Sequence, residues 1–366
     1  MFRHCAGYWR KIKHVWISLR DTDEKRRYKK VTLKDVARKA GVSYACVSAV
    51  LNNPAESRIR VSENTKQKIL EAADVLGYFP DITARSLKGA KKSLIAVFTY
   101  EKTFPVQSDN EFYDFFVGVE EEAERLGYDL LIINRRHTID DKFPRVLLAD
   151  GAVVIGVHKD ADSIKTLVKR RFPIVFIGRR EFKGIKTDWI TFDYEAVIYE
   201  LVCHIYDVCG RSAVYLEDAD SLGEAAQDKK KFLLATASKK GLGIRVFKAG
   251  DDGYDADCVA RIKKTHTVIL SRIKQIEGFE AFCKTQNLII GQDIFAAVLE
   301  DDWTGKFSYW TRWTNRRMEL GAGAVNLLTK HIADCTIESK DVALKPELIT
   351  GPTTAGLSFA VKNIGI

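Results

Sequence analysis

Two short helical patterns that meet at a single glycine, in TLKDVARKAGVSYACVSAVLN at residues 32–52, limit what this chain can fold into. Thr32 and Asp35 have the spacing of a capping box, which places a carboxylate at the positive end of a helix. Gly41 ends the first pattern, because glycine enters the left-handed conformation at little cost. Ser43 can cap the second pattern. Segments this short are not stable alone, so the sequence predicts that both helices pack against a third.

The third helix is predicted between Ser62 and Gly77, where apolar residues recur at helical spacing. The side chains expected in the shared core are Leu33, Val36, Ala37, Ala40, Val47, Val50, Leu51, Ile69, Leu70, Ala73 and Leu76. The second helix then leaves four side chains outward, namely Tyr44, Ala45, Ser48 and Asn52. Three short helices around one small core match a helix-turn-helix, whose second helix reads base edges in the major groove. The spacing alone fits an ordinary helical hairpin equally well.

The positive charge of the chain is concentrated in its N-terminal quarter. The whole sequence has 58 Lys and Arg against 49 Asp and Glu, but residues 1–92 alone hold 21 against 9. A basic segment joined to a nearly neutral body is typical of a polyanion-binding module attached to a domain with another task. A basic disordered tail would produce a similar surplus, so the charge alone leaves both interpretations open.

Residues 93–366 repeat an alternation of short Val- and Ile-rich runs with helical patterns. The apolar runs lie at 94–100, 128–134, 151–157, 173–178, 212–218, 243–249, 266–271 and 294–302, and helical patterns lie at 113–126, 161–171, 194–209 and 273–285. This alternation predicts parallel sheets with helices on both faces. Eight strands exceed one ordinary doubly wound sheet, so we expect two lobes with a ligand cleft between them, at the carboxyl ends of the strands.

The sequence lacks the motifs of common catalytic sites. No G-x-G-x-x-G follows a strand, no G-x-S-x-G, H-E-x-x-H or P-loop occurs, and the seven histidines never pair at metal-ligand spacing. We therefore expect no enzyme activity, no cofactor and no metal. Seven cysteines without a Cys-x-x-Cys pair, and no apolar run near the roughly 20 residues that span a bilayer, predict a cytoplasmic protein without a membrane partner.

The N-terminal motifs resemble the DNA-binding head of the lactose-repressor/galactose-repressor family. Besides residues 32–52, the resemblance rests on RVSENT at 60–65, ILEAADVLGYFP at 69–80 and ARSLK at 84–88. It implies a transcriptional repressor, expected to control carbohydrate-utilisation genes, that binds an inverted-repeat operator in double-stranded DNA as a homodimer. Two identical heads on one inverted repeat bury more surface than a single small head can.

The resemblance also divides the chain into four parts. Residues 31–80 become the helix-turn-helix domain, and residues 81–92 become a hinge helix and linker. Residues 1–30, a basic extension, have no family counterpart, and we interpret them as the product of a start codon placed too far upstream. The implied fold class is an all-α helix-turn-helix head followed by an α/β bilobed periplasmic-binding-protein-like core at 93–366, with lobe crossings near 190 and 318.

The resemblance implies that several side chains of the head and hinge contact DNA. They are Thr32, Ser43, Tyr44, Ala45, Ser48, Ala49, Asn52, Arg60, Arg85, Leu87 and Lys88. Many relatives carry a long polar or basic side chain where this sequence has Ala49, and Ala45 lies one turn before it. Two short side chains remove possible bidentate hydrogen bonds to bases. Specificity should then depend on Tyr44, Ser48, Ser43 and Asn52, on thymine-methyl contacts from the alanines and on DNA deformability.

Family landmarks continue through the core, but the residues expected at its ligand site depart from the family pattern. The residues that the resemblance places there are Asn110, Phe112, Tyr113, Arg179, Asp193, Asp228, Arg272 and Asp301. Asp228 replaces an arginine, and Arg272 with Ile273 replaces an Asn-Asp pair; in relatives these groups bind sugar hydroxyls. Their loss removes the fork geometry that holds a polyol.

Two interpretations of this departure stay open. Arg179, Arg272 and Asp301 could favour an anionic effector such as a sugar phosphate over a sugar, or small-molecule control could have been lost. A different class of function, a small-molecule (solute) binding protein without a DNA-reading role, is the alternative for the whole chain.

The hinge generates the first testable prediction. The resemblance makes Leu87 the apolar wedge at the centre of the operator, where a leucine between base steps unstacks and kinks the duplex. Leu87→Ala should therefore weaken specific binding strongly and leave weak, salt-sensitive binding to unrelated DNA. Titration of both proteins against operator and unrelated duplexes measures the difference. An equal loss on the two duplexes would exclude the wedge role.

Overall fold

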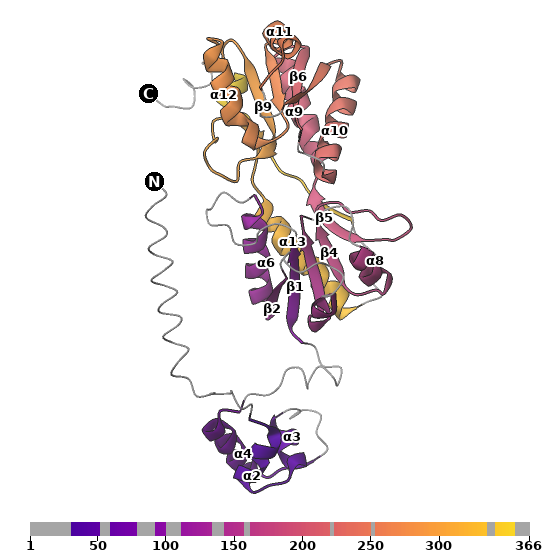
Figure 1. Cartoon of the computed structure of the whole chain (residues 1–366), viewed down its shortest axis with the longest axis vertical. Helices are drawn as coiled ribbons and strands as arrows, with labels where there is room; N and C mark the ends of the chain where they lie inside the picture. The colour runs from indigo at the N-terminus through magenta and orange to yellow at the C-terminus, as the bar shows by residue number, and fades with distance from the viewer. Residues whose placement is uncertain are drawn as a thin grey trace, which may run out of the picture. The chain divides into compact units, whose positions relative to one another are not determined.

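The computed structural model describes residues 31–51, 59–78, 92–99, 111–133, 143–156, 162–219, 223–249, 253–334 and 341–355. The chain divides into two compact units, residues 1–90 and residues 91–366 (Figure 1). The Asn52, Arg85, Leu87, Lys88 and Asn110 predictions lie outside the described residues. None of the described helices is long and apolar enough to cross a membrane.

The described part of the first unit contains three helices, α2 (Leu33–Ala40), α3 (Tyr44–Leu51) and α4 (Glu63–Leu76). They share a small core of six buried side chains, Val36, Ala37, Val47, Ile69, Ala72 and Ala73. The prediction for Leu70 is wrong, because this side chain is 44% exposed and Ala72 takes its place. The buried positions 69, 72 and 73 and the half-buried position 76 follow the helical repeat, and Leu70 lies about 100° away from Ile69.

The second unit consists of two lobes, each built on a six-stranded sheet. The N-terminal lobe has the order β11-β5-β4-β3-β1-β2, with β1 (Leu94–Thr99), β2 (Asp129–Ile133), β3 (Gly151–Ile155), β4 (Ile174–Ile177), β5 (Asp188–Phe192) and β11 (Asp341–Leu344). The C-terminal lobe has the order β12-β10-β9-β8-β6-β7, with β6 (Ser212–Asp218), β7 (Gly243–Ala249), β8 (Thr267–Leu270), β9 (Phe295–Asp301), β10 (Thr311–Trp313) and β12 (Leu348–Ile349). All pairings are parallel except β10 with β12.

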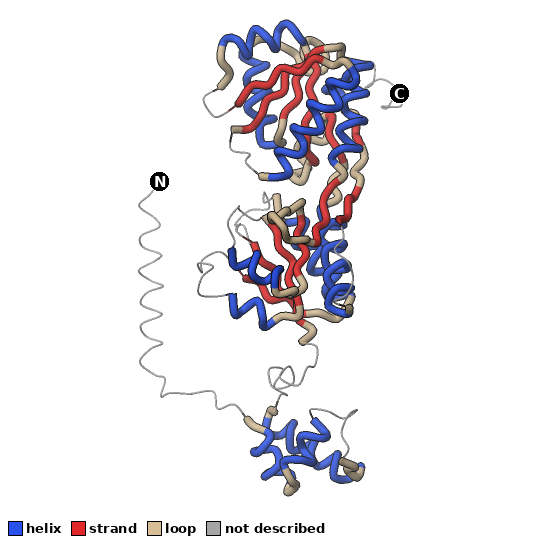
Figure 2. Tube along the Cα trace, turned by 90° about the vertical axis from the view of Figure 1, so that its right-hand side faces the viewer, coloured by secondary structure: helices blue, strands red, loops and turns tan. Residues whose placement is uncertain are grey.

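Helices cover both faces of each sheet (Figure 2). In the N-terminal lobe these are α6 (Tyr113–Arg125) and α13 (Arg317–Ala333) on one face, and the 3₁₀ helix η1 (Phe143–Leu148) and α8 (Asp162–Lys169) on the other. In the C-terminal lobe, α9 (Tyr194–Val208) and α10 (Glu224–Lys240) cover one face of the sheet. The other face is covered by η2 (Ile273–Gln275), α11 (Ala256–Thr265) and α12 (Ile276–Thr285). The last described element is α14 (Pro352–Ala355). The predicted fold class, a helical head with an α/β two-lobed core, is confirmed.

The chain passes between the lobes three times. It leaves the N-terminal lobe after β5, returns between β10 and α13, and leaves again between β11 and β12. Several elements were not among the predicted runs, namely η1, β5, β10, β11, β12, α10, α11, α13 and α14. β10 has only three residues, too short for a periodic signal, although its last residue Trp313 and the preceding Trp310 are fully buried.

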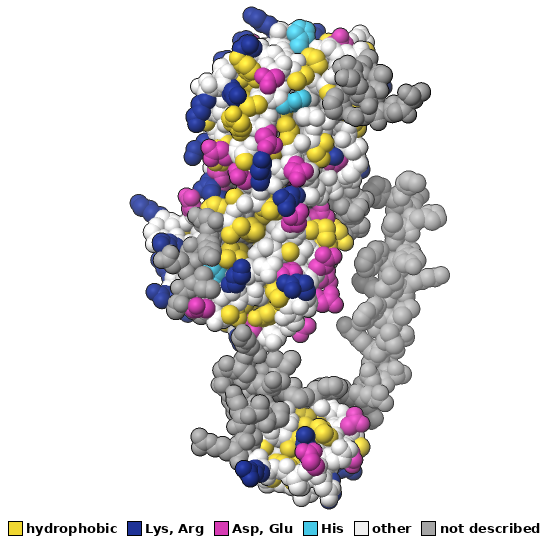
Figure 3. All heavy atoms as spheres, turned by 180° about the vertical axis from the view of Figure 1, so that it is seen from behind, with side chains coloured by type: hydrophobic (Ala, Val, Ile, Leu, Met, Phe, Trp, Pro, Cys, Tyr) yellow, Lys and Arg dark blue, Asp and Glu magenta, His cyan; other side chains and the backbone are white. Residues whose placement is uncertain are grey.

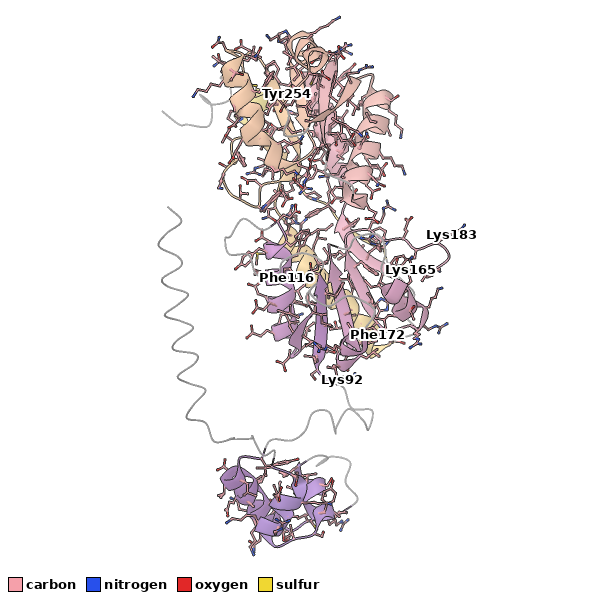
Figure 4. The ribbon with its side chains drawn as sticks, in the orientation of Figure 1. Lys92, Phe116, Lys165, Phe172, Lys183 and Tyr254 are labelled. Atoms are coloured by element: carbon pink, nitrogen blue, oxygen red, sulfur yellow. The ribbon has the colours of Figure 1, made fainter. Side chains whose placement is uncertain are left out.

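Lys92 anchors the start of the second unit to the N-terminal lobe. Its Nζ donates to the carbonyl oxygen of Ala149 at 3.0 Å, and its backbone N–H donates to Asp150 Oδ1 at 3.1 Å. In Figure 4 it lies at the end of this lobe that is remote from the C-terminal lobe. The first described residue after the linker is therefore tied to the lobe by both its side chain and its backbone.

Two glycines allow α6 and α13 to pack with their backbones in close approach. A Cβ atom on Gly118 would lie 1.9 Å from the carbonyl oxygen of Met318, and one on Gly321 would lie 2.2 Å from the carbonyl oxygen of Phe115. Any side chain at either position must push the helices apart.

Gly118→Ala should therefore destabilise the core by about 1–3 kcal/mol, because the added methyl group overpacks a backbone contact. Urea unfolding followed by circular dichroism measures the change. Gly278→Ala in α12 is the matched control, since nothing lies within 4 Å of its Cβ position. There the change should stabilise the helix by about 0.5–1 kcal/mol. Similar effects at the two sites would contradict the packing argument.

Candidate functional sites: the DNA-reading helix and the junction between the lobes

The first helix of the head is fixed by the predicted capping box. The backbone N–H of Thr32 donates to Asp35 Oδ2 at 3.0 Å, and the backbone N–H of Asp35 donates to Thr32 Oγ1 at 3.4 Å. Gly41 has a φ of 68°, so the left-handed ending is also confirmed. Together the two ends set where the chain turns into α3.

The second helix presents its polar N-terminal end outward. Ser43 Oγ accepts from the backbone N–H of Cys46 at 3.2 Å, which caps α3 as the sequence predicts. Tyr44 is 52% exposed, Ala45 is exposed and Ser48 is half-buried. These side chains are therefore accessible on the helix that a helix-turn-helix places in the major groove. Their contacts with bases stay predictions.

Ala49 departs from its predicted role as a DNA contact. Its surface is only 8% exposed, although it does not belong to the core cluster of the head. Thr32 and Arg60 are exposed, as a contact to DNA requires. A buried alanine at position 49 supplies little methyl surface to a thymine, and the role of Tyr44 in readout stays a prediction.

The junction between the lobes joins Arg179 to Asp228. Arg179 follows β4 in the N-terminal lobe, and Asp228 lies on α10 in the C-terminal lobe. Arg179 Nε and Nη2 each donate to one oxygen of Asp228 at 2.7 Å. These hydrogen bonds, aided by Glu181, outweigh partial burial and raise the pKa of Arg179. The paired geometry is the strongest that an arginine makes with a carboxylate.

A second arginine crosses the junction beside the first. Arg180 Nη1 donates to Glu224 Oε1 at 2.7 Å, and Arg180 is buried. Because Glu224 and Asp228 are four residues apart, they share one face of α10. Consecutive arginines of one lobe thus bind one face of a helix of the other.

Arg272, two residues after β8, is paired with carboxylates of both lobes. Arg272 Nε lies 2.9 Å from Glu300 Oε1, and Nη2 donates to the carboxylate of Glu111 in the N-terminal lobe. Burial opposes the charge of Arg272, but Glu300 and Glu111 outweigh it and raise the pKa of the guanidinium. Burial likewise opposes the charge of Glu300, yet Lys229, Arg272 and Arg317 hold its pKa below the usual range.

Arg317, the first residue of α13, completes the junction. Nε and Nη2 donate to the two oxygens of Asp301 at 2.6 and 2.8 Å, and Nη1 donates to the carbonyl oxygen of Glu111. The guanidinium also lies 4.6 Å from the centre of the Trp303 ring. Sequence reasoning missed this residue. Its position beside the predicted crossing near 318 is the signal that could have found it.

Lys229 is the second functional candidate that the sequence analysis missed. Its Nζ donates to the carbonyl oxygen of Leu299 at 2.9 Å and lies 3.7 Å from Glu300 Oε1. Burial lowers the pKa of this lysine, although Glu300 opposes the shift. The run DKKKF gave no signal, because three consecutive lysines on a helix usually face solvent.

The structure brings together only part of the predicted effector site. Arg179, Asp228, Arg272 and Asp301 all lie at the junction, each in an ion pair. Asp193 instead caps α9, where its Oδ1 accepts from the backbone N–H of Ala196 at 3.0 Å. Phe112 is half-buried and its ring centre lies 6.4 Å from that of Phe115, whereas Tyr113 is exposed. Whether these residues bind an effector stays a prediction.

Away from the junction, the surface is mixed in charge. Figure 3 shows acidic and basic side chains interspersed over one face of the second unit. This agrees with the near balance of charge after residue 92, and it confines the basic surplus to the N-terminal part of the chain. A helix-turn-helix unit followed by a two-lobed α/β unit defines a class of DNA-binding regulators with a sensory core.

Comparison with known proteins shows which family the DNA-binding head resembles. Residues 32–81 match the family model described as "Bacterial regulatory proteins, lacI family". The chain is 24% identical over 332 residues to catabolite control protein A of Priestia megaterium, which covers 86% of this chain and 96% of that protein. It is 35% identical over 144 residues to the HTH-type transcriptional repressor PurR of Photobacterium profundum, covering 38% of this chain and 40% of that protein.

Solved structures show the same fold. The lac repressor dimer bound to operator and the anti-inducer ONPF superposes with a TM-score of 0.70 at 20% identity, covering 89% of this chain and 99% of that chain. The complex of the transcriptional regulator CelR with cellobiose gives a TM-score of 0.58 at 18% identity, covering 88% and 100%. Residues 32–81 are thus similar to the DNA-binding domain of the lacI family, and the chain as a whole is similar to DNA-binding transcriptional regulators.

The lowered pKa of Glu300 predicts an acid-dependent loss of stability. Its folded pKa lies below the value of about 4.3 in an unfolded chain, so its ion pairs stabilise the fold fully above that pH and lose their contribution as the pH falls through the folded pKa. Glu300→Gln should cost about 3 kcal/mol at neutral pH, since it removes the carboxylate that pairs with the buried ammonium group of Lys229 and one of the two carboxylates that pair with Arg272.

Urea unfolding at neutral pH and at a series of acid pH values checks this. The difference between wild type and Glu300→Gln should shrink in acid. Glu319→Gln removes an exposed pair with Arg316 and should change stability by less than about 1 kcal/mol. A constant difference for Glu300→Gln at every pH would contradict the assignment.

Proposed function

We propose that this regulator is a cytoplasmic repressor that binds an inverted-repeat operator as a homodimer. The observation that carries the proposal is the exposed N-terminal end of α3, where Tyr44 and Ala45 project from a helix fixed by Gly41 and Ser43. The structural likeness to a lac repressor dimer bound to operator supports it. Residues 31–80 are proposed as the reading domain and residues 81–92 as the hinge.

Dimerisation follows from the size of the head. A single module of three short helices buries too little surface for tight specific binding, whereas two modules double the base contacts and read two half-sites. The core at 93–366 is the part of the chain that would hold the two copies together. If each head neutralises several phosphates, affinity for DNA should also fall steeply as salt rises.

A small molecule is the proposed signal, with a sugar or a sugar phosphate as the ligand class and carbohydrate-utilisation genes as the target. The carboxyl ends of β4, β8 and β9 point to the place, because ligands of open α/β sheets bind there. A relative of the same fold was solved with cellobiose. A ligand that prefers one arrangement of the lobes would shift operator affinity by its difference in affinity for the two arrangements.

A solute-binding protein without a DNA-reading role is less well supported. It would have no use for a basic helix-turn-helix unit, and the similar curated proteins named above are regulators of transcription. The lobes alone would suit either function, so only a test of DNA reading separates the two.

Selection from a randomised duplex pool with the full chain tests the repressor proposal. An enriched inverted repeat is the expected result, and repeating the selection with sugars and sugar phosphates shows which class changes the enrichment. A pool that stays random under every condition would exclude sequence reading and favour the solute-binding alternative.

Tyr44→Ala sharpens this test at one residue. The variant should lose about 1–3 kcal/mol of discrimination at one fixed position of each half-site, since a base contact is removed while phosphate contacts remain. Binding to a panel of operators mutated at single positions measures this. Lys39→Ala, on the exposed last turn of α2, is the control for a general loss of charge. Unchanged preference in the Tyr44 variant would remove this residue from the base readers.

A further inference from the structure

Ion pairs of the protein itself cross the junction between the lobes. Each pair takes its cation from one lobe and its carboxylate from the other; they are Arg179–Asp228, Arg180–Glu224, Glu111–Arg272 and Asp301–Arg317. Two of the arginines belong to loops after β4, one follows β8, and one begins α13. Each lobe contributes both cations and carboxylates to these pairs. The surface that each lobe presents at the junction therefore carries both signs of charge.

These groups occupy the place where the fold binds ligands. Arg179 lies two residues beyond β4, Arg272 lies two residues beyond β8, and Asp301 is the last residue of β9. The carboxyl ends of parallel strands are where doubly wound folds hold their ligands. Side chains that a ligand would have to engage are already engaged with one another.

The geometry of these ion pairs is suited to hold the two lobes together without a bound ligand. Asp228 and Asp301 each receive two hydrogen bonds from one guanidinium, a geometry that fixes orientation as well as distance. The side chains of Arg317 and Asp301 are only 7% and 2% exposed. Arg179 and Asp228 are 28% and 12% exposed, and Arg272 and Glu111 are 19% and 31% exposed, so these two pairs are partly buried. Separating charges that are held away from water is costly, because each loses a partner.

We propose that the Arg179–Asp228 and Glu111–Arg272 pairs form a latch that holds the two lobes together in the absence of any ligand. Separating the lobes breaks both pairs at once and exposes four charges to water in the open cleft. The latch deepens the proposed regulation of this junction, since a small molecule acting there must break the pairs to move the lobes. Its existence, however, does not require that the chain binds DNA.

Hydrogen exchange of the full chain, without DNA or added ligand, tests the latch. The double variant Arg179→Met, Arg272→Met removes one partner from each pair and keeps the aliphatic part of each side chain. Amides at the junction, in residues 179–182 and 224–228, should exchange at least about tenfold faster than in wild type. Amides of the central strands β3 and β8 should exchange at the wild-type rate, because each lobe keeps its own core.

Two matched variants separate a latch from a general loss of charge. Arg125→Met removes an arginine whose partner Glu122 lies on the same helix, with Arg125 Nη2 and Glu122 Oε1 2.6 Å apart, and it should leave junction exchange unchanged. A second double variant, Arg179→Asp with Asp228→Arg, swaps the two charges and restores this ion pair in the reverse orientation. Hydrogen exchange of the junction amides should then return toward the wild-type rate.

The proposal is overturned by junction amides that exchange in the double variant as slowly as in wild type. It is equally overturned by faster exchange throughout both lobes, which would assign the arginines to stability of the fold. Failure of the DNA selection leaves the exchange result intact, so the latch and the repressor function are tested independently.

Discussion

The core depends on a buried guanidinium that belongs to one lobe and is neutralised by the other. Arg317 begins a helix of the N-terminal lobe, yet both oxygens of Asp301 in the C-terminal lobe accept its hydrogen bonds. Burial alone would disfavour that charge, and the carboxylates reverse the effect, so that the pKa of Arg317 is raised. The charged pair is stable only while the lobes are in contact. The close packing of α13 on α6 through Gly118 and Gly321 then fixes where this arginine stands.

Local chemistry made the head predictable. Thr32, Gly41, Ser43 and Ser62 each satisfy backbone groups within a few residues of themselves, so their roles can be inferred without tertiary contacts. The central strands of the core were equally clear, since strands buried on both faces are continuous apolar runs. Edge and junction elements such as β10 were not predictable in this way, because their burial comes from contacts with segments distant in sequence.

At the junction, the pairing of side chains likewise depends on contacts between segments distant in sequence, which limits what can be predicted. Arg179, Asp228, Arg272 and Asp301 were expected at one site, and all four lie at the junction between the lobes. Three of them stand at the carboxyl ends of β4, β8 and β9, in the two sheets, and Asp228 comes from α10. Which of these side chains pair with one another could not be predicted, since the order of charges along the chain does not specify which residues of the two lobes come into contact. Lys229 illustrates the difficulty: one lysine of a consecutive three is buried, and only the turn of α10 decides which one.

Lys92 marks the point at which the chain becomes fixed to the N-terminal lobe. Because its ammonium group and its backbone are both held by the loop that ends at Asp150, Lys92 moves with the N-terminal lobe. A rotation of this lobe displaces Lys92 by an amount that grows with its distance from the rotation axis. In the proposed dimer, a small rotation in each core would therefore change the distance between the two Lys92 residues, and that distance is what the two proposed half-sites would sense.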